Sequence, residues 1–207
     1  AIKTLNQFNI KNAHLDSEVL LAKVLNKDRN YIILNSKEHL GQKYLFRFNN
    51  LIERRKKGEP VAYLTRKKEF WKNDFYVDQN VLVPRPDTEL IVEEVLKFSK
   101  KKFKLQILDI GTGSGILAIA AAKLGARKVI ALDTDRMAVN IARANARSNG
   151  VSHGIRFQHG TLPHCNINNT TFDLILANIY ARVLKDMASH FITMLRAGGL
   201  LVASGIL

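Results

Sequence analysis

Hydrophobic residues change their spacing about halfway along the chain. Before residue 60 they recur every three or four positions, as in amphipathic helices, and we expect helices near 15–25 and 38–57. From residue 105 onward, short apolar runs alternate with segments of helical spacing. The runs predict five strands: LQILDI, KVIALD, GIRFQH, FDLILAN and GGLLVASGIL. The other segments predict helices over 114–124, 135–149 and 181–195. This alternation predicts an α/β fold, a doubly wound parallel sheet with helices on both faces.

The segment 61–80 separates the two patterns. It contains VAYLTRKKEFWKNDFYVD, in which two strand-like runs flank a polar turn, and this predicts a β-hairpin. We therefore expect a helical domain over 1–60, a hairpin linker over 61–80 and an α/β domain over 81–207. Two prolines then lead into a helix that begins near Asp87-Thr88-Glu89.

Composition narrows the class of protein. The chain has 207 residues, of which 46% are hydrophobic, and no apolar run reaches the length of a membrane helix. The first residues lack the apolar stretch of a signal peptide. The single cysteine, Cys165, excludes an internal disulfide and a cysteine-based zinc site, and the histidines show no spacing typical of metal ligands. We expect a soluble cytoplasmic protein without a bound metal.

The net charge of +14 favours an acidic partner, such as RNA or a ribonucleoprotein. The longest basic runs, at 54–57, 66–68 and 100–102, all lie in the first half of the chain. Any one of them is typical of a solvated face. Three together favour an electrostatic docking surface.

The first predicted strand leads into a glycine-rich turn. Asp109 is the second-last residue of that strand, LQILDI, and Gly111-Thr112-Gly113-Ser114-Gly115 and a helix follow the strand, while the second strand ends in Asp133. Glycines allow a tight turn and a close approach to a ligand, and an acid at the second strand end can accept hydrogen bonds from a ribose. The spacing is neither the dinucleotide G-x-G-x-x-G nor a phosphate-binding loop. A nucleoside ligand at the carboxyl ends of the strands is therefore expected.

The sequence ILDIGTGSGILAIA, followed by VIALDTD, resembles the S-adenosylmethionine site of class I methyltransferases, which have a Rossmann-like fold. The resemblance implies that the glycine turn lies against the methionine part of the cofactor, that Asp109 meets its amino group and that Asp133 holds its ribose. The expected cofactor-binding residues are Asp109, Gly111, Thr112, Gly113, Gly115, Asp133, Thr88 and Leu162. Thr88 precedes the first strand near the cofactor, or simply caps a helix. Leu162 follows the third strand, near the adenine.

Two subfamilies are visible in different parts of the chain. Residues 12–95 resemble the release-factor glutamine methyltransferases (HemK/PrmC type), above all in VLVPRPDTEL. That resemblance implies a small N-terminal domain that docks the substrate protein. The second half resembles ribosomal protein methyltransferases (PrmA type) in ANIYARVL and GGLLVASGIL. Enzymes of that type modify lysine side chains and an N-terminal amine.

The fourth strand ends in Asn178. A buried strand does not itself require a side-chain amide at its end, so the residue suggests a separate role. Alone, this Asn is typical of a turn at a strand end. Both subfamilies, however, place an Asn there, and the resemblance implies that Asn178 is the catalytic residue and orients the acceptor nitrogen. Ile179 and Tyr180 are expected to contact the substrate with it. The glutamine enzymes have Asn-Pro-Pro-Tyr at this place, whereas this chain has Asn-Ile-Tyr-Ala.

The leading hypothesis is a protein N-methyltransferase that acts on the translation apparatus, on a release-factor glutamine side chain. One alternative is a lysine or N-terminal amine of a ribosomal protein. Another is a non-catalytic protein that binds RNA or the ribosome on a methyltransferase scaffold. Class I enzymes usually add two further strands after the fifth, so we also expect this sequence to be a truncated piece.

Overall fold

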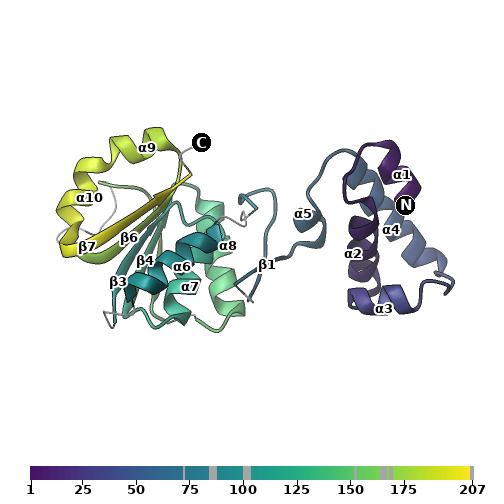
Figure 1. Ribbon diagram of the computed structural model, residues 1–207, viewed down its shortest axis with the longest axis horizontal. Coiled ribbons are helices and arrows are strands. Elements are labelled where there is room, and N and C mark those ends of the chain that lie inside the picture. The colour runs from purple at the N-terminus through teal and green to yellow at the C-terminus, as the bar shows by residue number, and fades with distance from the viewer. Residues whose placement is uncertain are drawn as a thin grey trace. The chain divides into compact units, whose positions relative to one another are not determined.

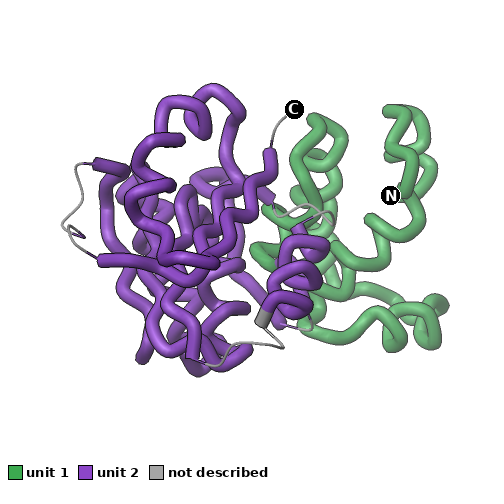
Figure 2. Tube along the Cα trace, turned by 60° about the vertical axis from the view of Figure 1, so that its left-hand side comes forward, with its two compact units in different colours: residues 1–67 green, residues 68–207 purple. Residues whose placement is uncertain are grey.

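The computed structural model describes residues 1–71, 73–83, 88–99, 104–151, 153–163, 167 and 170–205. The chain divides into two compact units, residues 1–67 and residues 68–207, which Figure 2 colours separately. The sequence predicted boundaries after residues 60 and 80, whereas the two units meet after residue 67. The hairpin is therefore part of the second unit and not a separate linker.

The first unit is entirely helical (Figure 1). Its helices are α1 (Ile2–Gln7), α2 (Ala13–Leu25), α3 (Arg29–Leu34), α4 (Gln42–Lys56) and α5 (Val61–Thr65). They enclose a small core whose buried members are Leu5, Ala13, Leu20, Phe48, Ile52 and Leu64. The two helices expected from spacing are α2 and α4, which are confirmed. The six-residue helices α1 and α3 were not predicted, because so short a segment shows little periodicity.

The run at 61–65 is helix α5, and the expected strand there is wrong. The carbonyl of Pro60 accepts hydrogen bonds from the amides of Tyr63 and Leu64, at 3.0 and 3.1 Å. Leu64 is buried in the helical core, and Val61 packs against that core. Residues three positions apart, such as Val61 and Leu64, lie on the same side of a helix but on opposite faces of a strand. Because both residues pack on the core of the first unit, the segment forms a helix.

The second unit begins with the predicted hairpin, shortened to β1 (Lys68–Phe70) and β2 (Asn73–Phe75). Phe70 and Phe75 are buried and meet edge to face, with ring centroids 6.2 Å apart. Both rings join the main core of this unit. Helix α6 (Thr88–Ser99) follows.

The five predicted strands form one parallel sheet, which confirms the fold. They are β3 (Gln106–Ile110), β4 (Lys128–Asp133), β5 (Ile155–His159), β6 (Phe172–Asn178) and β7 (Leu195–Ser204), in the order β5-β4-β3-β6-β7. The connecting helices are α7 (Ile116–Lys123), α8 (Arg136–Ser148), α9 (Ala181–Asp186) and α10 (Ala188–Met194). Within the described ranges, no helix is both long and apolar enough to cross a membrane.

Helices cover both faces of the sheet (Figure 1). Apolar residues of α6, α7 and α8 pack with alternate strand residues such as Ile107 and Val129. The intervening residues, such as Leu108 and Ile130, face a second cluster that includes Met187 and Phe191 beside α9 and α10. Because side chains alternate along a strand, strands buried on both faces read as continuous apolar runs.

The single helix expected over 181–195 is two helices that meet at Met187. Met187 is buried in the second cluster, so the chain turns inward there. Strand β7 also begins at Leu195, three residues before GGLLVASGIL, because Leu195 already pairs with Phe172.

Candidate active site

The glycine turn after β3 is fixed to the end of β4. The amides of Gly111 and Thr112 both donate to the carbonyl of Leu132, each at 2.9 Å. The carboxyl ends of β3 and β4 therefore form one rigid edge, to which β6 adds Asn178. In an open α/β sheet this edge is where ligands bind.

The three glycines of this turn have different surroundings. All have positive φ, which side-chain-bearing residues rarely adopt. A Cβ on Gly111 would lie 2.3 Å from Cγ2 of Ile179, and one on Gly115 would lie 2.9 Å from Cβ of Ala142 in α8. A Cβ on Gly113 would meet nothing within 4 Å. Gly111 and Gly115 thus permit close packing, whereas Gly113 borders open space that a ligand can occupy.

The carboxylate of Asp133 lies beside Gly113. Its Oδ2 accepts a hydrogen bond from the Gly113 amide at 2.8 Å, and its Oδ1 accepts one from the Asp135 amide at 2.9 Å. Each carboxylate oxygen has a second lone pair, so two further donors can be accepted. The half-buried Asp133 is therefore held in place by the backbone and retains capacity for the two hydroxyls of a ribose.

Asp109 is a buried carboxyl group under the glycine turn. Its side chain is 1% exposed, and its Oδ2 accepts a hydrogen bond from the Thr112 hydroxyl at 2.6 Å. Its Oδ1 has no hydrogen-bond partner of ordinary geometry among the described residues. Burial raises the pKa of Asp109 from 3.8 to about 6, although the Thr112 hydroxyl and the Ala118 amide act in the opposite direction. An unpartnered buried oxygen of this kind suits a cationic donor.

Asn178 ends β6 next to the start of α6. Its Nδ2 lies 3.5 Å from the hydroxyl oxygen of Thr88, a long and weak hydrogen bond, and Thr88 itself is buried. A Cβ added to Gly205, which has φ of +83°, would lie 3.2 Å from Oδ1 of Asn178. The absence of a side chain at Gly205 therefore leaves room at the oxygen that would accept a hydrogen bond.

The neighbours expected to contact ligands occupy different environments. Ile179 packs on Gly111 and against the second core cluster, so it forms a wall between the glycine turn and β6. Tyr180 is 75% exposed at the start of α9. Leu162 is buried in the second core cluster. A contact between Leu162 and an adenine stays a prediction.

One polar residue near the site was missed. Asn145 of α8 is 1% exposed, and its Nδ2 donates to the carbonyls of Ser114 and Tyr76, at 2.8 and 3.0 Å. Its Oδ1 accepts a hydrogen bond from the Tyr76 amide at 2.8 Å. This single amide thus ties the glycine turn to the segment that follows the hairpin. Its signal in the sequence is an Asn on the otherwise apolar face of a helix.

Comparisons with known proteins follow the division into two parts. Residues 1–65 match the family model described as "PrmC N-terminal domain", and residues 86–207 match the one described as "Ribosomal protein L11 methyltransferase (PrmA)". The chain is 37% identical over 190 residues to the "Release factor glutamine methyltransferase" of Buchnera aphidicola subsp. Schizaphis graminum, covering 91% of this chain and 67% of the relative. The protein of the same name from Shewanella oneidensis is 40% identical over 136 residues, 65% of this chain and 47% of that protein. The chain thus spans about half to two thirds of these relatives.

Solved structures resemble part of the chain. A ribosomal protein L11 methylase from Lactobacillus delbrueckii subsp. bulgaricus is 37% identical, with a TM-score of 0.53, over 59% of this chain and 62% of that one. An RNA methyltransferase from Salinibacter ruber, solved with S-adenosyl-L-homocysteine, is 23% identical, with a TM-score of 0.50, over 58% of this chain and 76% of that one. The second likeness shows the fold alone.

Proposed function

Because the chain belongs to the class I S-adenosylmethionine-dependent methyltransferases of the HemK/PrmC type, we propose that it methylates the side-chain amide of a glutamine in a release factor. The observation that carries this proposal is the meeting of Asn178 with the glycine turn at one sheet edge, where Ile179 packs directly on Gly111. An acceptor held by Asn178 would therefore lie beside the space that Gly113 leaves open. We place this activity in the cytoplasm, with the translation machinery.

The residues at this edge fit S-adenosylmethionine. Asp133 retains acceptors for ribose hydroxyls, the unpartnered Oδ1 of Asp109 suits an amino group, and Gly113 leaves room for the chain between them. When bound, the cofactor would supply a methyl group on a positively charged sulfur. As the acceptor nitrogen forms its bond to the methyl carbon, the carbon–sulfur bond would break, and the nitrogen would lose one proton during or after the attack.

Asn178 acts on the acceptor side of the same edge. In this proposal its Oδ1 accepts a hydrogen bond from the acceptor nitrogen and so directs the nitrogen lone pair, while Thr88 holds Nδ2. Ile179 excludes water from one side. For a displacement of this type, orientation of the two reactants and exclusion of water supply much of the rate.

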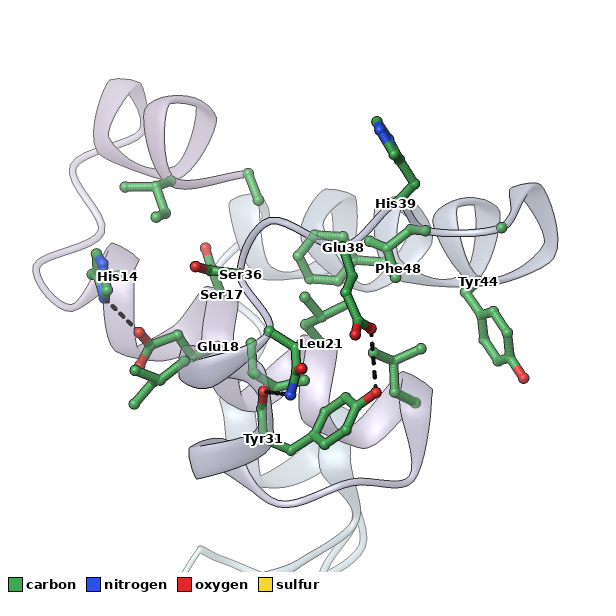
Figure 3. Close-up of a pocket in the computed structure, with 18 of the residues that line it drawn as sticks. His14, Ser17, Glu18, Leu21, Tyr31, Ser36, Glu38, His39, Tyr44 and Phe48 are labelled. Atoms are coloured by element: carbon green, nitrogen blue, oxygen red, sulfur yellow. Dashed lines mark hydrogen bonds and ion pairs between the residues drawn. The ribbon is translucent and has the colours of Figure 1, made fainter.

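The first unit is proposed to dock the substrate protein. It contains a pocket of about 810 Å³ between α2, α3, α4 and the N-terminus (Figure 3). Leu21 and Phe48 contribute apolar lining and Glu38 carries negative charge, whereas Glu18 is paired with Arg29 at 2.7 Å. In Figure 3, the side chain of His14 points to Glu18, and its Nδ1 lies 3.1 Å from Oε1 of that residue. The Tyr31 hydroxyl points to Glu38 and lies 3.3 Å from its Oε2. Such a pocket suits a side chain with an apolar stem and a basic or polar end.

A lysine or terminal amine of a ribosomal protein is the second candidate acceptor. It is favoured by Asn-Ile-Tyr-Ala at 178–181, which lacks the two prolines of the glutamine enzymes, and by the PrmA match over 86–207. Incubation with methyl-labelled S-adenosylmethionine and an equimolar mixture of purified release factor and ribosomal proteins separates the candidates. We expect label in the release factor. Label confined to a ribosomal protein would establish the second candidate instead.

The cofactor affinity should depend on the ionisation of Asp109. Because the pKa of Asp109 is about 6 in the ligand-free protein, and a cationic amino group favours the carboxylate, affinity should fall about tenfold between pH 7 and pH 5. The same raised pKa means that the native ligand-free protein holds this proton more tightly than the unfolded chain. Its contribution to stability therefore falls as the pH rises from about 4 to about 6.

Calorimetric titration with S-adenosylmethionine at several pH values tests this. The Asp109→Asn variant is the control, in which the dependence over this range should disappear. A wild-type affinity that is constant from pH 5 to pH 7 would exclude Asp109 from the cofactor site.

Asn145→Asp should weaken cofactor binding about tenfold or more. The substitution keeps the size and the acceptor oxygen but removes both donors, which leaves the carbonyls of Ser114 and Tyr76 without their hydrogen bonds. Asn149→Asp is a matched control one helical turn later. Asn149 Nδ2 also holds the hairpin, through the Asp74 carbonyl at 2.9 Å, but does not reach the glycine turn. Calorimetry should give the control an affinity within twofold of wild type, and equal losses in both variants would refute the special role of Asn145.

A further inference from the structure

Strand β7 lies next to β6 in the sheet and ends beside Asn178 (Figure 1). Its last residue, Ser204, pairs in register with Asn178, and the Ser204 carbonyl accepts a hydrogen bond from the Ile179 amide at 3.1 Å. The chain stays close to Asn178 after the strand, since a Cβ on Gly205 would lie 3.2 Å from Asn178 Oδ1. The carboxyl end of β7 is therefore fixed beside the oxygen that is proposed to orient the acceptor nitrogen.

The side chains of Asn178 and Ser204 project from the same face of the sheet. Each follows, by two positions, a residue that packs in the main core of this unit, Leu176 in β6 and Val202 in β7. Residues two apart in a strand share a face, because side chains alternate. Neighbouring strands are only about 4.8 Å apart, so paired residues on one face are adjacent. Sequence analysis missed Ser204, because only strand pairing places it next to Asn178.

The hydroxyl group of Ser204 can bind a ligand. The residue is half-buried, and its hydroxyl forms no hydrogen bond with any other residue that the structure describes. A hydroxyl oxygen has two lone pairs, so it can accept a hydrogen bond from an N–H group. Ser204 Oγ and Asn178 Oδ1 are thus two uncharged acceptors that adjacent strands present on one face of the sheet.

We propose that Ser204 binds the acceptor nitrogen together with Asn178, an inference that rests on the proposed methyl transfer. The NH2 group of a glutamine side chain has two N–H donors in its plane and a nitrogen lone pair perpendicular to that plane. A single acceptor leaves the group free to rotate about one hydrogen bond. Two acceptors, Asn178 Oδ1 and Ser204 Oγ, fix the plane and so give the lone pair one direction.

Both hydrogen bonds should strengthen as the methyl group is transferred. The nitrogen forms its bond to the methyl carbon while the electron pair of the carbon–sulfur bond returns to sulfur. Positive charge then develops on the nitrogen until one of its two protons is lost to water. Hydrogen bonds from a charged donor are stronger than those from a neutral one. Ser204 should therefore affect turnover more than binding of the ground state.

The test is methyl transfer from S-adenosylmethionine to purified release factor by the intact chain and its variants. S204A should lower kcat about five- to tenfold, the effect of one lost hydrogen bond, and leave the cofactor affinity within about twofold of wild type. S204T keeps the hydroxyl and should retain at least about half of the turnover. The double variant S204A/A203S moves the hydroxyl one residue back, to the opposite face of β7, and should stay as slow as S204A.

A double-substitution cycle tests whether both residues bind one nitrogen. S204A should then lower turnover by a smaller factor in the N178A background than in wild type, because a nitrogen without its first partner is already misplaced. Equal factors in the two backgrounds would mean that Ser204 acts on another group, and would overturn the inference.

Three other results would also overturn it. These are full turnover in S204A, restored turnover in S204A/A203S, and a cofactor affinity that falls as much as turnover does. The proposed function fails in a different way, if wild type methylates a lysine or a terminal amine in place of glutamine. A neutral amine also has two N–H donors, so the same variants then test Ser204 on that acceptor. Methylation of no protein by wild type would overturn both proposals.

Discussion

The Asn178→Ala variant is expected to transfer methyl groups about a hundredfold more slowly than wild type, while it binds S-adenosylmethionine within about threefold. If Oδ1 of Asn178 orients the acceptor nitrogen, its loss lets the nitrogen move by about 1 Å, and a displacement reaction is sensitive to such a shift. An interaction that matters mainly in the transition state changes turnover rather than ground-state affinity. Single-turnover kinetics and calorimetry on the same preparation separate the two quantities.

Two further variants sharpen this prediction. Asn178→Asp keeps the size and the acceptor oxygen but adds a charge, so it tests whether a neutral amide is required. Thr88→Val removes the hydroxyl that lies 3.5 Å from Nδ2 and preserves the side-chain shape. Because that contact is long, its loss should lower turnover only a few-fold. Full turnover in Asn178→Ala would return Asn178 to the role of a turn residue at a strand end.

Asp133→Ala is expected to weaken S-adenosylmethionine binding by about 2–4 kcal/mol, because two hydrogen bonds between ribose hydroxyls and a carboxylate are lost. The same carboxylate also holds the amides of Gly113 and Asp135. Part of the loss therefore comes from a looser glycine turn.

Asp135→Ala separates the two contributions. Asp135 is the neighbouring carboxylate, and its Oδ1 caps α8 by accepting from the Met137 amide at 2.8 Å. Its removal should destabilise the helix start and reduce cofactor affinity by less than about 1 kcal/mol. If calorimetry gives Asp133→Ala the affinity of wild type, the ribose is bound elsewhere.

The sheet could be predicted well from the sequence because the central strands are largely apolar runs with a polar residue at or next to their carboxyl ends. Strands β4 and β6 begin and end where KVIALD and FDLILAN do. The glycine turn was predictable for a similar reason, since spaced glycines between a strand and a helix have few other uses. The placement of Asp109, Asp133 and Asn178 at one edge then follows from parallel strand order.

Other features depend on contacts that spacing alone does not reveal. The helix at 61–65 forms because Leu64 is buried in the first unit, although VAYLT is equally compatible with a strand. The importance of Asn145 depends on its hydrogen bonds to the carbonyls of Tyr76 and Ser114, which lie 69 and 31 residues away in the sequence. The basic run at 54–57 was a plausible docking surface until its ion pairs were seen, since Asp16 lies far from Arg55 in sequence.

The most direct test of the proposed function is to find the atom that receives the methyl group. After incubation of the chain, S-adenosylmethionine and purified release factor, fragmentation mass spectrometry of the proteolytic peptides locates the added methyl group. The account predicts one methyl group on the side-chain nitrogen of a release-factor glutamine, and its near absence with Asn178→Ala. Methyl groups found only on a lysine or a terminal amine of a ribosomal protein, or on no protein at all, would contradict it.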